Sequence, residues 1–151
     1  MEMMAISLLN SFSHDKDWQS REDTYLSIVK KYNREELDNF AKLLAMITLL
    51  IEDEPKDHLG PIYMELGANK NTGQFFTPYH LSLLTAKMSL SDIKTKAEEK
   101  IVTIDDPAVG AGGMLIAATQ VAKDEKVPIS RLCLSGADVD LVCVHMTYIQ
   151  L

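Results

Sequence analysis

The spacing of apolar residues predicts that the chain begins with helices. The run from Met3 to Leu9 predicts a first helix, and apolar residues then recur at steps of three and four after Asn33. Asn33 followed by Glu36 is a capping-box signature, so this stretch predicts an amphipathic helix of about four to five turns. Its predicted apolar stripe consists of Leu37, Phe40, Ala41, Leu44, Ile47, Thr48 and Ile51.

The segment after this helix predicts a connector, a short helix and a loop. The acidic stretch from Glu52 to Asp57 is typical of a solvated connector, and a short helix is expected around Pro61 to Leu66. Gly67 to Gly73 has the composition of an exposed loop. We place a boundary there, between a helical region (residues 1–72) and a second region (residues 73–151).

Another helix is predicted directly after this loop. Thr77 is expected to be its N-cap with Pro78 at the first helical position. Leu81, Leu84, Thr85 and Met88 then continue the apolar pattern, and the helix should end at about Leu90.

The period changes from residue 101 onward. Ile101 to Ile104 predicts a strand, Asp105 to Gly113 a glycine-rich turn, and the residues from Met114 to Val121 a helix with small residues on one side. Arg131 to Ala137 predicts a second strand and Leu141 to Leu151 a second helix. This order is typical of the start of a doubly wound α/β domain with a parallel sheet.

Two features suggest that this sheet is incomplete. The sequence predicts only two strands, and the last helix is apolar on nearly every side, so it should be covered from both directions. Because unpaired strand edges and exposed apolar helix faces favour association, we expect the chain to self-associate.

Composition excludes several classes of protein. The 151 residues are 46% hydrophobic and 25% charged, which excludes disorder and low complexity. The net charge is −7 without a basic block, so this chain is not expected to grip a phosphate backbone alone. The longest apolar run, Leu43 to Ile51, is too short to span a membrane.

Cysteine and histidine usage excludes other sites. Cys133 and Cys143 form no CxxC pair and lie in apolar stretches, which favours a reducing, cytoplasmic location. The four histidines have no metal-ligand spacing, so no metal site is predicted.

The loop DPAVGAGG, residues 106–113, is the first candidate for binding chemistry. It lies where a parallel strand ends and a helix begins, the position at which α/β folds bind nucleotide-like ligands. Leu115 replaces the third glycine of a dinucleotide fingerprint and GK[ST] is absent, but the acidic onset suits a positively charged ligand. The alternative is a plain glycine turn.

Two further segments could complete a site. In the stretch from Gly136 to Asp140, Asp138 could accept hydrogen bonds from both hydroxyls of a ribose, while Asp140 should cap the last helix. In the GQFFTP segment, residues 73–78, two aromatic rings could form an apolar wall and Thr77 could bind a carboxylate. The alternatives are that both aspartates are only caps or turn residues and that the phenylalanines belong to the core.

These three segments, in this order, resemble the N6-adenine DNA methyltransferases that serve as modification subunits of type I restriction-modification systems. The resemblance covers about Asp57 to Leu151. It implies an S-adenosylmethionine-dependent Rossmann-like domain preceded by helices. The cofactor-binding residues that it implies are Gly73, Gln74, Phe75, Phe76, Thr77, Pro78, Asp106, Pro107, Ala108, Gly110, Gly112, Gly113, Asp138 and Val139. In that family the glycine loop holds the methionine part of the cofactor, and the residue that matches Asp138 binds its ribose. The residue that matches Val139 lies against its adenine.

The sequence departs from that family at the catalytic motif. Methyl transfer to adenine needs an (N/D)PP(Y/F) segment around the flipped base, and none of the five prolines here is adjacent to another. We therefore assign no catalytic residue. We expect a fragment of the methyltransferase that is truncated after the second strand and helix and is inactive alone. DNA should be bound by the full-length enzyme or complex rather than by this chain, and specificity or restriction subunits are the expected partners. The alternative is a non-catalytic interaction module or truncated remnant that assembles with such subunits.

Overall fold

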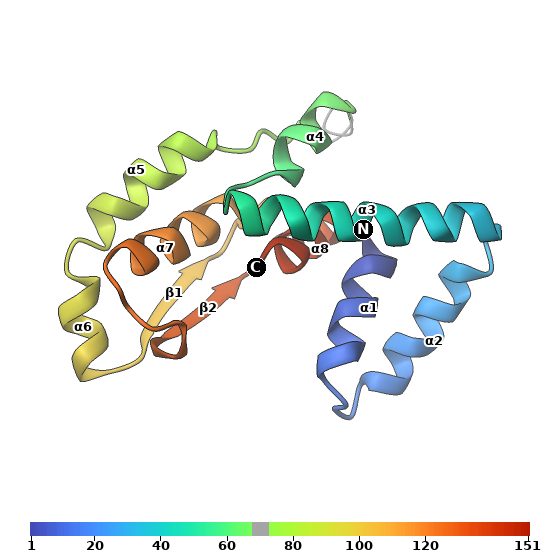
Figure 1. Cartoon of the computed structure of the whole chain (residues 1–151), viewed down its shortest axis with the longest axis horizontal. Coiled ribbons are helices and arrows are strands. Elements are labelled where there is room, and N and C mark those ends of the chain that lie inside the picture. The colour runs from blue at the N-terminus through green and yellow to red at the C-terminus, as the bar shows by residue number, and fades with distance from the viewer. Residues whose placement is uncertain (68–72) are drawn as a thin grey trace.

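The structure is a computed structural model that describes residues 1–67 and 73–151. Figure 1 shows one long helix, α3, with a helical hairpin of α1 and α2 at one end and a small sheet with its covering helices toward the other. The elements, in chain order, are α1 (Glu2–Phe12), α2 (Trp18–Val29), α3 (Arg34–Asp53), α4 (Leu59–Glu65), α5 (Tyr79–Ser89), α6 (Ile93–Glu99), β1 (Val102–Asp106), α7 (Gly113–Asp124), the 3-10 turn η2 (Ile129–Arg131), β2 (Leu132–Gly136) and α8 (Leu141–Gln150).

The predicted α/β class and the two parallel strands are confirmed. Strands β1 and β2 pair from Val102 opposite Leu132 to Asp106 opposite Gly136. Successive residues point to opposite faces of the sheet, and one face packs on α7. The other face is exposed in the described part of the chain, and it carries Thr103, Asp105, Cys133 and Ser135. The prediction of apolar surroundings is therefore wrong for Cys133, because the alternation places it on this uncovered face.

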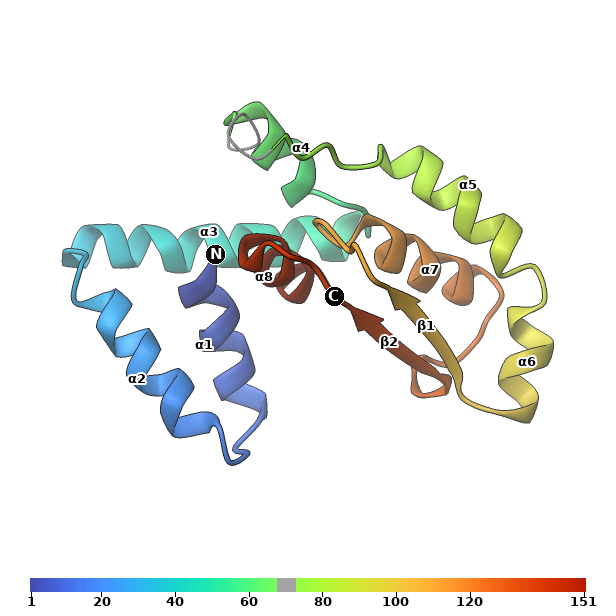
Figure 2. The same cartoon turned by 180° about the vertical axis from the view of Figure 1, so that it is seen from behind.

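Two hydrophobic cores divide the molecule. The first joins α1, α3, α4 and α8 and includes Ala111 of the glycine loop. The second joins α5, α6, α7 and the sheet. Both views of the fold show α8 beneath α3 and beside α1 (Figures 1 and 2). The glycine loop therefore lies where the two cores meet.

Helix α3 follows its predicted pattern. The Asn33 side chain accepts a hydrogen bond from the Glu36 N–H at 3.0 Å, and Glu36 accepts one from the Asn33 N–H at 2.8 Å, so the capping box is confirmed. Ile47 is buried and Phe40 and Leu44 pack on the first core. No helix among the described residues combines the length and hydropathy that crossing a bilayer requires.

Helix α5 has the predicted extent but not the predicted orientation. Leu81, Leu84 and Met88 are 45%, 55% and 73% exposed, whereas Ser82 and Ala86 are buried. The reason is the close packing of α5 along α7, whose facing surface also carries small side chains. Small residues let two helices approach closely, so the apolar stripe of α5 points outward.

Two other expectations concern α8 and the loop before α5. Helix α8 is covered by α1, α3 and α4, while Leu141 and Leu151 are 68% and 52% exposed. The expectation that the chain associates with itself stays a prediction. The loop predicted from Gly67 to Gly73, with the domain boundary in it, falls largely on residues 68–72, outside the described residues. The sequence did not predict α2, α6 or η2 as separate elements.

Candidate functional site

The two loops that follow β1 and β2 lie side by side. The Ala137 N–H donates to the Asp106 carbonyl oxygen, and the Val109 N–H donates to the Ala137 carbonyl oxygen, both at 2.9 Å. The strand pairing thus continues beyond the carboxyl ends of the strands. This is the edge at which open α/β sheets bind ligands.

Glycines in the first loop allow this chain's own side chains to approach its backbone. Gly110 and Gly112 have φ values of +55° and +93°, which other residues rarely adopt. A Cβ on Gly110 would lie 3.0 Å from a ring carbon of Phe76, and one on Gly112 would lie 3.1 Å from Thr147 Oγ1. The Thr147 hydroxyl also donates to the Gly110 carbonyl oxygen at 3.0 Å. The loop is therefore held between the GQFFTP segment and α8.

Asp138 organises both loops. Its Oδ2 accepts a hydrogen bond from the Gly110 N–H and its Oδ1 accepts one from the Asp140 N–H, each at 2.9 Å. Asp140 accepts from the Val142 N–H at 2.9 Å, which confirms the predicted cap of α8. A carboxylate oxygen can accept a second bond, so Asp138 keeps acceptor capacity. Val139 beside it is fully exposed.

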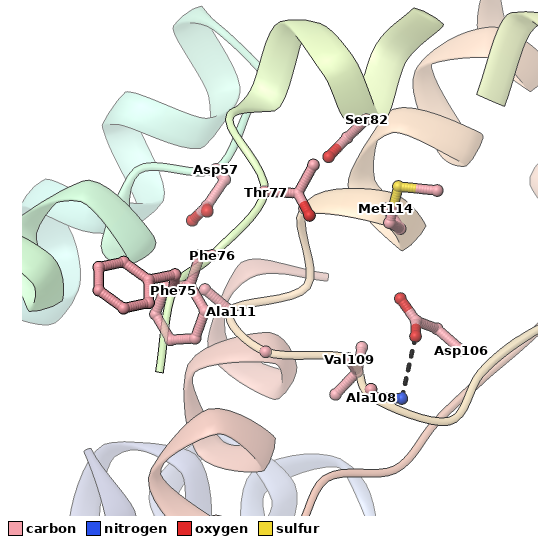
Figure 3. A pocket seen from close by; sticks show the side chains of 12 residues that line it. Asp57, Phe75, Phe76, Thr77, Ser82, Asp106, Ala108, Val109, Ala111 and Met114 are labelled. Atoms are coloured by element: carbon pink, nitrogen blue, oxygen red, sulfur yellow. Dashed lines mark hydrogen bonds between the residues drawn. The ribbon is translucent and has the colours of Figure 1, made fainter. Parts of the chain in front are cut away.

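A cavity of about 80 Å³ opens between the GQFFTP segment, the glycine loop and the start of α7 (Figure 3). By the same measure one water needs about 10–15 Å³, so the cavity has room for a small group of several atoms. Its lining residues are Asp57, Phe75, Phe76, Thr77, Ser82, Asp106, Ala108, Val109, Gly110, Ala111, Gly113 and Met114.

Half of the predicted site residues line this cavity, and the other half do not. Lining residues from the prediction are Phe75, Phe76, Thr77, Asp106, Ala108, Gly110 and Gly113; Gly73, Gln74, Pro78, Pro107, Gly112, Asp138 and Val139 lie outside its lining. Phe76 packs on the first core and lies 5.5 Å from the Tyr63 ring, whereas Phe75 is 81% exposed. The core interpretation thus fits Phe76 but not Phe75.

The prediction that Thr77 caps α5 is wrong. Pro78 occupies the N-cap, and no side chain caps this helix. The Pro78 carbonyl oxygen accepts from the Leu81 and Ser82 N–H groups at 2.9 and 3.2 Å. Thr77 precedes the cap and is exposed at the cavity, so its hydroxyl is available there.

Asp57 lies at the back of the cavity, although the sequence predicts a solvated connector there. It is only 5% exposed, and its Oδ1 accepts from the Gly60 N–H at 2.7 Å and from Gln150 Nε2 at 3.0 Å. Gln150 also donates to the Ala111 carbonyl oxygen at 2.7 Å. Its Oε1 accepts from the His58 and Leu59 N–H groups at 2.8 and 2.9 Å. A buried polar bridge therefore links α8, the start of α4 and the glycine loop.

Ser82 has a fully buried hydroxyl that has no hydrogen-bond partner among the residues that the structure describes. Its Oγ lies 3.5 Å from where a Cβ on Gly113 would be, and Asp57 Oδ2 lies 3.7 Å from the same point. Gly113 is the first residue of α7, whose N-terminus has no side-chain cap. An unpartnered donor, a carboxylate oxygen and free helix N–H groups thus converge on one glycine.

The thiol behind the loop is not a nucleophile at neutral pH. Burial, together with the charges of Asp138 and Asp140, raises the pKa of Cys143 to about 12. A neutral buried thiol is inert. Among the described residues no group of three His, Cys, Asp or Glu side chains could hold a metal ion.

The family of the chain follows from its sequence match. A family model described as N-6 DNA methylase matches residues 56–151. The chain belongs to the N-6 DNA methylase family. The matched part of this methylase-family chain contains α4 to α8 and every residue that lines the cavity. No curated protein and no solved structure matches it significantly.

Sequence reasoning missed Asp57, Ser82, Thr147 and Gln150. Ser82 lies within an apolar helical pattern, and Thr147 and Gln150 are polar residues in a helix that is otherwise apolar nearly all round. For Thr147 and Gln150, a polar residue at a position where burial is expected is the signal that could have identified them. Ser82 lies off the predicted apolar stripe and Asp57 lies in the acidic connector, so the sequence contains no such signal for these two residues.

Proposed function

We propose that this chain is the cofactor-binding part of an adenine-specific (N6) DNA methyltransferase and that it binds S-adenosylmethionine at the carboxyl ends of β1 and β2. The observation that supports the proposal is the convergence of three distant segments at that edge of the sheet, within the part of the chain that matches the family. Their order in the sequence alone did not require them to meet.

The residues fit the amino-acid end of this cofactor. The cavity is small and polar at its back, and it contains the unpartnered Ser82 hydroxyl. Asp106 offers a carboxylate for an ammonium group, since within the described part of the chain only its Oδ1 accepts a hydrogen bond, from the Ala108 N–H at 3.1 Å. Thr77 would close over the cofactor carboxylate. Asp138 would hold the ribose and Val139 would contact the adenine on the open side.

When bound, the cofactor supplies an electrophilic methyl group, and this chain's own residues would orient it. Acceptance of that methyl group by adenine requires residues that this sequence does not contain, because it has no (N/D)PP(Y/F) segment. The proposed contribution of the chain is therefore to bind and position the cofactor. DNA contact, and the specificity or restriction subunits, belong to the rest of the enzyme in this proposal.

Calorimetry with S-adenosylhomocysteine, the unreactive product form of the cofactor, tests the proposal. We expect binding by the wild-type chain and at least tenfold weaker binding by Asp106→Ala. Asp105→Ala is the matched control, because Asp105 carries the same charge one residue earlier but lies on the uncovered face of the sheet. Absence of binding by the wild-type chain at millimolar ligand would refute the proposal.

A non-catalytic interaction module is the second candidate. The outer edges of the two-stranded sheet and the exposed leucines of α5 favour it, because unpaired strand edges and exposed apolar groups bind other chains. In this case the chain should associate with itself or with methyltransferase or specificity subunits and should not bind S-adenosylhomocysteine. Sedimentation with and without that ligand separates the two candidates. A cytoplasmic location fits both.

A further inference from the structure

We infer that Ser82 and Asp57 are specificity-determining residues that bind the two charged groups of an α-amino acid, the end of the ligand that enters the cavity. This inference rests on the proposed function and deepens it, since neither residue belongs to the three motifs that the sequence identified.

The lining of the cavity excludes most other ligand classes. An apolar group would leave the Ser82 hydroxyl unpartnered in a buried place, which is costly. An anion such as phosphate would meet the carboxylates of Asp57 and Asp106. A simple cation would face the uncapped N-terminus of α7, where the helix dipole is positive.

A zwitterion satisfies all of these groups together. Its carboxylate can accept from the Ser82 hydroxyl and the first N–H groups of α7 as well as from Thr77. Its ammonium group has three N–H donors, so it can donate to Asp57 Oδ2 as well as to Asp106. Ser82 Oγ and Asp57 Oδ2 lie 3.5 and 3.7 Å from the same point above Gly113. Figure 3 shows Ser82, Thr77 and Asp106 around the space that such a group would occupy.

Gly60 and Gln150 hold Asp57 for this role. Both donate to Asp57 Oδ1, at 2.7 and 3.0 Å, and no hydrogen bond from a described residue reaches Oδ2. A Cβ on Gly60 would collide with Oδ2, so this oxygen fits closely against the helix α4 backbone. One oxygen of Asp57 therefore fixes the side chain, and the other remains available to a ligand.

Ser82 is the sharper test, because its hydroxyl makes no hydrogen bond with any described residue. Ser82→Ala should not lower the thermal midpoint of the free chain, because it removes an unsatisfied buried group and adds a better helix former. It should nevertheless weaken the binding of S-adenosylhomocysteine about tenfold or more, which is the usual effect of losing a hydrogen bond to a charged group. Ser89→Ala, at an exposed position of α5, is the matched control.

Calorimetry of the full chain with three ligands tests each pairing. The ligands are S-adenosylhomocysteine, its analogue without the carboxylate and its analogue without the amino group. Ser82→Ala should lower the affinity for S-adenosylhomocysteine but leave the affinity for the decarboxylated analogue within twofold of wild type. Asp57→Asn, which keeps the shape of the side chain, should lower the affinity for S-adenosylhomocysteine but not the affinity for the deaminated analogue.

The possible outcomes distinguish this inference from the proposed function. Binding by the wild-type chain with unchanged affinity in Ser82→Ala and Asp57→Asn would overturn the inference alone. Equal weakening of all three ligands would also overturn it, because it would show a general effect on the site. Failure of the wild-type chain to bind S-adenosylhomocysteine would overturn the proposed function and this inference together.

Discussion

Gln150 Nε2 donates a hydrogen bond to Asp57 Oδ1 at 3.0 Å and thereby joins two residues that lie 93 positions apart. Both side chains are buried, at 4% and 5% exposure. With its bonds to Ala111, His58 and Leu59, the amide of Gln150 uses both its donor and its acceptor. The back of the cavity is thus held by the last turn of α8.

Gln150→Leu should therefore destabilise the chain by about 2–4 kcal/mol, because it leaves several buried polar groups unsatisfied at about 1–3 kcal/mol each before relaxation. Urea unfolding measures this change. Gln19→Leu is the control, since Gln19 is exposed and its side-chain amide donates to Asp23 on its own helix. Similar losses of stability in the two variants would show that the Gln150 bridge contributes little.

Gly112→Ala tests how closely α8 approaches the glycine loop. Its φ of +93° disfavours alanine, and the added Cβ would also lie 3.3 Å from the Thr147 backbone. Gly73→Ala is the control, because Gly73 has a φ of +65° but nothing within 4 Å of its Cβ position. We expect Gly73→Ala to cost about 1 kcal/mol of unfolding free energy and Gly112→Ala to cost more. The reverse order would contradict the close packing of loop and helix.

Thr77→Val should leave the stability of the free chain within about 0.5 kcal/mol of wild type, because Thr77 does not cap α5. Asp140→Ala should cost about 1 kcal/mol, because Asp140 does cap α8. Thermal unfolding of both variants makes the comparison. A clear loss of stability in Thr77→Val would restore the capping role that the sequence predicts for it.

The two cysteines should differ in reactivity and in their effect on stability at high pH. Cys133 is exposed and should react with a thiol reagent in the folded chain, whereas Cys143 should react only after unfolding. The pKa of Cys143 is raised from 9.0 to about 12 in the fold, by burial first. Its neutral thiol therefore favours folding fully below pH 9, and this contribution is lost as pH rises from 9 toward 12.

The thermal midpoint of the wild-type chain measured from pH 8 to pH 11 should fall more steeply than that of Cys143→Ala. The variant lacks the ionising group, although it is less stable at every pH because of the cavity that it creates. Parallel curves for the two proteins would contradict the raised pKa.

Local signals in the sequence determined most of the elements. The capping box of α3, the two strands, the glycine loop and the cap of α8 depend on residues within a few positions of one another, so the sequence predicts them directly. The three motifs also identify the methylase family, which the match over residues 56–151 shows. The conformational preferences that form caps, strands and turns depend on neighbouring residues, so they can be read from a single sequence.

Tertiary structure alone decided which side of α5 faces the protein and which polar residues are buried. Helix α7 approaches α5 so closely that the small residues of α5 face it and the leucines point outward. Nothing near Ser82 in the sequence shows this approach. Asp57 belongs to a stretch with the composition of a solvated connector, but Gln150 and Gly60 lie beside it only in the folded chain. Burial depends on contacts between distant segments, and it made these two residues part of the site.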